Sequence, residues 1–332
     1  MPNIETLALE AEEKKAREFL RKEQAERDKT LKMLRTAMRG FLEFFDDPRV
    51  VEIMLNEDGS LWIERAGEGM MDTGRKIAPP EAERFISIVS TVTQDKINKA
   101  KPFLSGELPI WGSRIQAVIP PGSTNPIFSI RQKAKIVFPL EDYVVKGIMT
   151  ERQREVIVDA VWKRSNILVV GGTGTGKTTL TNAILQEIAK TKSRLLILED
   201  TAELQCSYSN TVFLRQREGF TMRQMVRSSM RLRPDRIIVG EVTDGAALDL
   251  LKAWNTGHPG GVSTIHADSA QAGLIRLEQL IQEALPMPQR SLIGEAVDVI
   301  VYIERTPKSR KVKEIVQVEG FRHDEYILHA IA

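Results

Sequence analysis

Apolar and polar residues along the chain follow different periods in different regions. Residues 5–30 are dominated by charged residues and helix formers with a thin apolar stripe, which predicts a solvent-exposed helix. From Leu31 to Phe45, apolar residues recur at steps of three and four, which predicts an amphipathic helix ended by the following Asp-Asp-Pro. The exposed helix is interpreted as a solvated leader, with a docking or coiled-coil arm as the alternative.

The next hundred residues alternate short strand patterns with one helical pattern. Residues 50–56 and 60–65 flank Glu-Asp-Gly and predict a β-hairpin. A Pro-Pro pair opens a predicted helix over roughly 81–96, and two further strands flank a Pro- and Gly-containing loop at 120–126. Residues 137–150 show no clean period and are interpreted as a linker.

After Thr150, a candidate helix N-cap, strands and helices alternate, which predicts an α/β domain. The apolar runs lack period-two alternation, as expected of strands buried on both faces. We therefore expect four regions: a charged helical leader at 1–36, a smaller α+β domain at 37–136, the linker at 137–150 and the α/β domain at 151–332.

Composition excludes several function classes. The 332 residues carry 47 basic and 45 acidic side chains, so the net charge of +2 gives no general argument for nucleic acid. Cys206 is the single cysteine, which excludes a disulfide framework and a four-cysteine zinc site. The acidic N-terminus does not resemble a secretory signal, and no long apolar run predicts a membrane span, so we expect a cytoplasmic protein.

The segment GGTGTGKTT, which begins at Gly171, follows a predicted strand and opens a predicted helix, as a phosphate-binding P-loop does. Its glycines let backbone N–H groups surround a phosphate, Lys177 adds a positive charge, and the hydroxyl of Thr178 can ligate Mg²⁺. ATP and Mg²⁺ are the expected cofactors. The predicted nucleotide-binding residues here are Gly172, Thr173, Gly174, Thr175, Gly176, Lys177, Thr178 and Thr179.

Acidic residues end two further predicted strands. Glu241 ends the strand RIIVGE, and we hypothesise that it polarises the attacking water; a salt bridge is the alternative. The strand RLLILED ends in Glu199 and Asp200, with Glu203 one turn further on. Because ligands bind at the carboxyl ends of such strands, these acids are candidates for the second shell of Mg²⁺, with Glu203 preferred, also as a catalytic residue. A helix N-cap explains Asp200 equally well.

Thr264 and His266 lie two residues apart on another predicted strand, beside three glycines, and so face the same side. A sensor of the γ-phosphate or of a neighbouring subunit fits His266 better than a metal site, because no second His or Cys is near.

The arginines suggest further contacts. Arg223, Arg227 and Arg231 form one stripe on a predicted helix, which fits a solvated face, ion pairs across a subunit interface or nucleic-acid contact; the lack of interleaved aromatic residues argues against the last. Arg114 and Arg131 fall on adjacent predicted strands, from which they are hypothesised to close a nucleotide site.

Four segments in this order, GGTGTGKTTL, LILEDTAEL, LRPDRIIVGE and GHPGGVSTIHA, resemble the Walker A, Asp, Walker B and His boxes of the secretion traffic ATPases. The segment GSRIQAVIPPGSTNPIFSIRQK is similar to the type IV secretion branch, in particular its conjugal-transfer ATPases. The resemblance covers roughly residues 35–320.

The resemblance implies a homohexameric ring whose subunits have an N-terminal sensing domain hinged through 137–150 to a RecA-like P-loop NTPase domain, with ATP between them. It implies that Arg114 and Arg131 reach the phosphates, that Glu241 is the hydrolytic carboxylate and that His266 belongs to the switch. Inner-membrane components of a type IV secretion machine are the implied partners, and the implied location is cytoplasmic and peripheral at the inner membrane.

Two departures from the family limit the comparison. Many relatives carry an arginine soon after the Walker B glutamate, where this chain has Val242-Thr243, and the four-cysteine insertion usual in type II secretion ATPases is absent. A pilus retraction or assembly motor and an ATP-regulated nucleic-acid-binding module remain as alternatives, although no stable nucleic-acid site is predicted.

Overall fold

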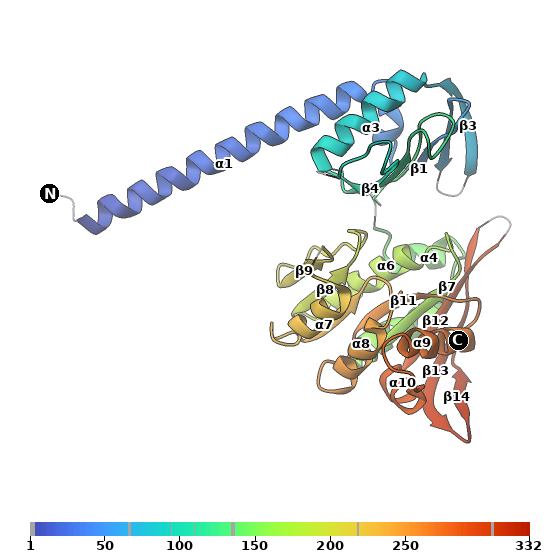
Figure 1. The fold of residues 1–332 in the computed structure, drawn as a ribbon. Helices are drawn as coiled ribbons and strands as arrows, with labels where there is room; N and C mark the ends of the chain where they lie inside the picture. The colour runs from blue at the N-terminus through green and yellow to red at the C-terminus, as the bar shows by residue number, and fades with distance from the viewer. Residues whose placement is uncertain are drawn as a thin grey trace. The chain divides into compact units, whose positions relative to one another are not determined.

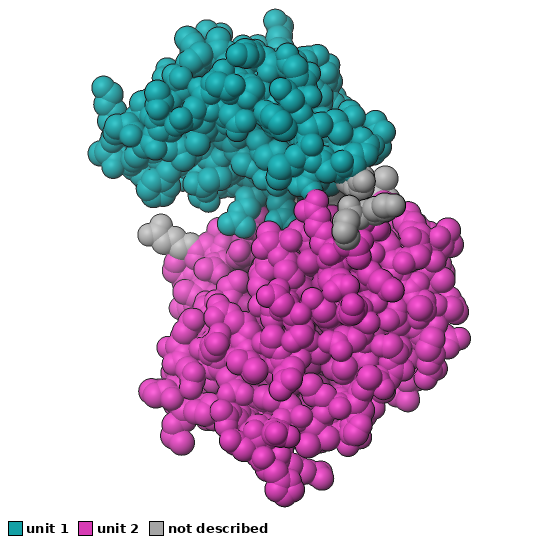
Figure 2. Space-filling view, turned by 90° about the vertical axis from the view of Figure 1, so that its right-hand side faces the viewer, with its two compact units in different colours: residues 1–133 teal, residues 134–332 magenta. Residues whose placement is uncertain are grey.

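The computed structural model describes residues 4–65, 68–93, 95–109, 111–133, 137–217, 219–306 and 309–332. The chain divides into two compact units, Met1–Lys133 (unit 1) and Ala134–Ala332 (unit 2), which Figure 2 distinguishes by colour. The domain boundary expected at residue 136 falls in 134–136, which lie outside the described residues.

Unit 1 is an antiparallel sheet covered by helices. Its elements are α1 (Ile4–Ala37), α2 (Leu42–Asp46), β1 (Val50–Leu55), β2 (Ser60–Arg65), β3 (Gly69–Lys76), α3 (Pro79–Thr93), β4 (Phe103–Leu108), β5 (Ser113–Val118) and β6 (Ile127–Arg131). The strand order is β3-β2-β1-β6-β5-β4. The predicted hairpin is confirmed as β1–β2, whereas β3 and β4 were not predicted.

The helical leader is one long helix, and its N-terminal part extends beyond the rest of unit 1 in Figure 1. The helix predicted from Leu31 to Phe45 is interrupted, because the chain turns at 38–41 between α1 and α2. Gly40 lies in this turn, where a Cβ would approach Cδ1 of Ile77 to 2.7 Å. The predicted buried face is nevertheless present, since Phe41 and Phe45 are 1% exposed.

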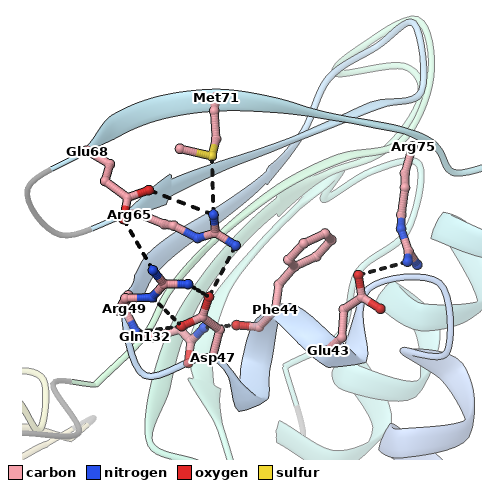
Figure 3. A network of polar contacts seen from close by, with 9 residues as sticks. All are labelled: Glu43, Phe44, Asp47, Arg49, Arg65, Glu68, Met71, Arg75 and Gln132. Carbon is pink, nitrogen blue, oxygen red and sulfur yellow. Dashed lines mark hydrogen bonds and ion pairs between the residues drawn. The ribbon is translucent and has the colours of Figure 1, made fainter.

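A polar network ties the end of α2 to the first strands of unit 1 (Figure 3). The backbone amide of Arg49 donates to Oδ1 of Asp47 over 2.9 Å, and Nη2 of Arg65 lies 3.2 Å from Oδ2. The hydrogen bonds from Arg49, first from its backbone amide and then from its side chain, lower the pKa of Asp47. Arg49 is exposed, whereas Asp47 and Arg65 are partly buried, and the geometry of the network fits a structural role at the start of β1.

Unit 2 is built around a mostly parallel sheet. Its elements are α4 (Leu140–Val145), α5 (Glu151–Trp162), β7 (Ile167–Gly171), α6 (Lys177–Lys190), β8 (Leu195–Glu199), β9 (Thr211–Arg215), α7 (Met222–Ser229), β10 (Arg236–Val239), α8 (Ala246–Asn255), β11 (Val262–His266), α9 (Ala270–Gln282), α10 (Arg290–Ala296), β12 (Val299–Arg305), β13 (Arg310–Arg322) and β14 (Glu325–Ala330). The order is β14-β13-β12-β7-β11-β10-β8-β9, in which only β13 and β14 run antiparallel to their neighbours.

This strand order brings the loops that follow several strands to one edge of the sheet. The strands β7, β11, β10 and β8 are parallel neighbours and are buried over nearly their whole length. Their residues are mostly apolar, as two-sided burial favours, except in β11, which carries the buried hydroxyls of Ser263 and Thr264. The carboxyl ends of parallel strands lie at the same edge of a sheet, so the loops after these four strands converge.

Part of the segment predicted as a linker, 137–150, is folded into unit 2. Residues 140–145 form α4, whose Leu140 and Tyr143 are buried in a core shared with α5 and α6. The side chain of Thr150 caps α5 in a capping box with Gln153, which confirms the predicted N-cap. A hinge function of the segment remains a prediction. In the described part of the chain, no helix is long and apolar enough to cross a membrane.

Candidate functional site

The P-loop connects the central strand β7 to the helix α6. Gly176 caps α6 with φ +95°, and Gly174 has φ +70°, a region that side chains with a Cβ rarely enter. A Cβ on Gly171 would collide with the backbone oxygen of Ile303 on β12. At these three positions, therefore, glycine is needed for the turn and for the close packing against the neighbouring strand.

Lys177 is held inside the loop. Its side chain is 7% exposed, and its ammonium donates to the carbonyl oxygens of Gly171 (2.9 Å) and Gly172 (3.0 Å). The same Nζ lies 3.2 Å from Nδ1 of His266 at the end of β11. A buried ammonium beside a helix N-terminus and a turn of glycines fits the phosphates of a nucleotide.

Glu241 and His266 meet beside this lysine. Nε2 of His266 lies 2.8 Å from Oε1 of Glu241, which follows β10. The hydroxyl of Thr264 donates to the carbonyl of Gly240 over 2.8 Å, and the amide of Val242 donates to the carbonyl of Thr264. These bonds join the ends of β10 and β11 and thereby bring Lys177, His266 and Glu241 together. The roles predicted for these residues, phosphate binding by Lys177, water activation by Glu241 and phosphate sensing by His266, remain predictions.

The two acids that follow β8 differ in their surroundings. Glu199 is 2% exposed, and its Oε1 accepts the backbone amides of Glu203 (2.9 Å) and Leu204 (2.6 Å). This carboxylate holds the loop after β8 in its conformation. The side chain of Glu203 is partly exposed and is less involved in holding that loop. No helix starts at Asp200, because the described chain is irregular until β9, so the N-cap interpretation is wrong.

The arginines divide into two groups. Arg114 and Arg131 are direct cross-strand partners on β5 and β6, and both are exposed; their contact with phosphates remains a prediction. In unit 2, Nε of Arg223 and of Arg227 lie 2.7 and 2.9 Å from the two oxygens of Asp249 on α8. Two arginines of the predicted stripe therefore pair within the chain, and the third, Arg231, lies beyond the end of α7.

A buried network supports the opposite end of β11. Oδ1 of Asn166 accepts hydrogen bonds from the backbone amides of Gly260 (2.8 Å) and Gly261 (3.1 Å), and the backbone N–H of Asn166 donates to Oδ2 of Asp298 over 2.7 Å. Burial raises the pKa of Asp298 despite this hydrogen bond. The guanidinium of Arg236, which is 1% exposed, donates to the carbonyl of Gly260 over 3.1 Å. Burial lowers the pKa of Arg236 to about 10.

Sequence reasoning missed two charged residues beside the P-loop. A Cβ on Gly172 would lie 3.9 Å from Oδ1 of Asp268, and one on Gly176 would lie 3.1 Å from Cδ of Arg310. Asp268 lies two residues after His266, so the same sequence motif could have indicated it. Arg310 opens β13 and lies in no recognisable motif, so only the sheet brings it to the loop.

Among the described residues, no group of three or more His, Cys, Asp or Glu side chains is arranged to hold a metal ion. The donor set nevertheless fits Mg²⁺ as P-loop proteins bind it, because that ion takes one or two protein oxygens together with phosphates and waters. Thr178, the second residue of α6, is partly exposed and supplies such an oxygen.

A phosphate loop after the central parallel strand, with an acid and a histidine on neighbouring strands, defines unit 2 as a RecA-like P-loop NTPase domain, as the sequence predicted. Residues 42–324 match the family described as "Type II/IV secretion system protein". The chain belongs to this family.

Similar proteins indicate the branch of the family to which the chain belongs. A "Probable conjugal transfer protein TrbB" from Sinorhizobium fredii is 52% identical over 283 residues, which cover 85% of this chain and 87% of the relative. A "Type IV secretion system protein VirB11" from Bartonella henselae is 27% identical over 335 residues, which cover 87% and 94%. The crystal structure of the Legionella pneumophila ATPase DotB shares the fold, with a TM-score of 0.61 and 19% identity over 83% of this chain and 79% of that one. The predicted family and its type IV secretion branch are confirmed.

Proposed function

We propose that this chain is a Mg²⁺-dependent ATPase that powers a conjugative type IV secretion system. The observation that carries the proposal is the cluster of Lys177, His266 and Glu241 at the phosphate loop. The relatives with conjugal transfer and type IV secretion names support the setting.

Each residue of the cluster has its own part in hydrolysis. The backbone amides of the loop and the ammonium of Lys177 bind the β- and γ-phosphates. Glu241 orients and polarises the attacking water, and His266, in contact with both charged groups, responds to the presence of the γ-phosphate. Loss of that phosphate therefore changes the environment of two neighbouring strands at once.

The hydroxyl of Thr178 would hold Mg²⁺, which neutralises charge on the phosphates when bound. Glu203 is the better candidate for supporting the water ligands of the ion. Glu199 already accepts two backbone amides at its Oε1, which directs that oxygen to the protein rather than to a ligand.

The test of the catalytic assignment is a pair of variants in the full-length protein. Lys177→Ala is expected to lose ATP binding in calorimetry. Glu241→Gln should bind ATP with parent affinity but hydrolyse it about 10²–10⁴-fold more slowly, the usual contribution of a general base. Glu283→Gln, at an exposed position after α9, serves as the matched control and should leave both properties unchanged. Parent-rate hydrolysis by Glu241→Gln would contradict the assignment.

We further propose a homohexameric ring at the cytoplasmic face of the inner membrane, in which 137–150 acts as a hinge and Arg114 and Arg131 contact the phosphates. The resemblance to traffic ATPases supports these points. Arg114→Ala and Arg131→Ala should reduce ATPase activity, whereas Arg84→Ala, an exposed position on α3, should not. Sedimentation with and without ATP tests the ring, and monomers under every condition would contradict it.

A further inference from the structure

The strand order of unit 2 places β7 and its P-loop between two sides of the sheet. On one side, β11 and β10 carry His266 and Glu241, the residues assigned to the γ-phosphate. On the other side lie β12 and β13. The P-loop surrounds the β-phosphate, and the γ- and α-phosphates leave it in different directions. The side of β12 and β13 is thus the side available to the α-phosphate end of a nucleotide.

Arg310, the first residue of β13, stands at that side of the loop. A Cβ on Gly176 would lie 3.1 Å from its Cδ, 3.5 Å from its Nε and 3.6 Å from its Nη1. The guanidinium therefore packs against the residue that caps α6, next to the inward-facing amides of the loop. Arg310 is partly exposed, and its backbone pairs with Arg305 of β12. No hydrogen bond or ion pair links its side chain to another described residue, so the donors of the guanidinium are available to a ligand.

The backbone of β13 next to Arg310 is held in place by hydrogen bonds. Two residues further along β13, Val312 donates its amide to the carbonyl of Ile148 over 2.7 Å and accepts from the side chain of Gln153 over 3.2 Å. Tyr143 of α4 is 5% exposed, and its hydroxyl has no hydrogen-bond partner among the described residues. Burial raises the pKa of Tyr143, and the positive charge of Arg310 opposes the rise, as expected of a guanidinium near the phenol.

We propose that Arg310 is a nucleotide-binding residue that contacts the diphosphate part shared by ATP and ADP. The proposal rests on the nucleotide binding assigned to the P-loop. A planar guanidinium beside the loop can donate two parallel hydrogen bonds to phosphate oxygens, which an ammonium cannot do. Arg310 thus holds the nucleotide from the side opposite Glu241 and His266, before and after hydrolysis alike.

The test is calorimetric titration of the full-length protein with MgADP and with a non-hydrolysable ATP analogue. Arg310→Ala should weaken both affinities by the same factor, about tenfold, the factor that 1.4 kcal/mol represents. In steady-state assays its KM for ATP should rise while kcat stays at the parent value, because the contact is made equally in the ground and transition states. Arg310→Lys should recover only part of the affinity.

Lys311→Ala is the matched control. It removes the same charge from the adjacent, exposed position, whose side chain points to the other face of β13, and it should leave both affinities unchanged. Thermal melts of all variants verify folding. If Arg310→Ala is unstable, the nucleotide affinity of Arg310→Lys still tests the proposal.

Three outcomes would overturn the inference. Unchanged ADP and ATP affinities in a folded Arg310→Ala protein would show a merely structural residue and leave the ATPase proposal standing. A loss confined to the ATP analogue would move Arg310 to the γ-phosphate. Absence of nucleotide binding by the parent protein would overturn both proposals together.

Discussion

Arg236 provides the sharpest test of how the candidate site is supported. Its guanidinium lies at the start of β10 and donates to Gly260 over 3.1 Å and to Val161 over 2.9 Å. In Arg236→Met the apolar stem remains while the donors are lost. Gly260 would then lose its donor, whereas the carbonyl of Val161 would keep the amide of Arg164.

The expected magnitude follows from these contacts. Hydrogen bonds from a charged group contribute about 1.5–3 kcal/mol each, and a buried carbonyl left unpaired costs about 1–3 kcal/mol. Relief of the desolvated guanidinium offsets part of this loss. We therefore expect the free energy of unfolding to fall by about 3 kcal/mol, and Tm to fall by roughly 9 °C at about 2–4 °C per kcal/mol for a unit of this size.

The measurement is urea and thermal unfolding of the full-length protein followed by circular dichroism. Arg152→Met on α5, where the side chain is 69% exposed, is the control and should change stability by no more than about 0.5 kcal/mol. If Arg236→Met were as stable as this control, the reasoning that β10 and β11 depend on the buried guanidinium would be refuted. Nucleotide affinity, measured in parallel, reports whether the site moves with the support.

Three further perturbations have defined outcomes. Gly176→Ala forces φ +95° on a residue with a Cβ, which costs about 1–2 kcal/mol, so stability and ATP affinity should both fall in melts and calorimetry, and an unchanged affinity would speak against the loop geometry. Asp249→Ala leaves two arginines of α7 without their carboxylate and should lower the unfolding free energy by about 1 kcal/mol in low-salt urea titrations, less in high salt; salt independence would count against the ion pairs. Burial raises the folded-state pKa of Asp298, so the free energy of unfolding of the wild-type protein falls as the pH rises through that pKa. The difference in this free energy between wild type and Asp298→Asn should therefore shift in favour of the variant from low pH to pH 7. A constant difference across a pH series would contradict this.

Contiguous residues made much of the site predictable. The P-loop is specified within nine residues, because its conformation needs glycine at particular positions and its chemistry needs a lysine and a hydroxyl beside them. Glu241 and His266 were also accessible, since apolar runs identify parallel strands and the carboxyl ends of such strands share an edge. The family resemblance added the branch, which the comparisons confirm.

Other features depended on contacts between distant parts of the chain. The apolar residues of 137–150 carry no clear period, and α4 forms there because Leu140 and Tyr143 find a core made by later helices. Asp249 is one of many surface acids until α7 and α8 pack together and give it two arginines.

Local sequence alone determined which backbone can bind a phosphate and which strands are buried, because these properties arise from neighbouring residues and from periodicity. Tertiary structure alone decided which strands become neighbours of the P-loop. That order, with β12 and β13 on one side and β11 and β10 on the other, is set by long-range packing, and it is what places Arg310 beside the loop and joins Glu241 to His266.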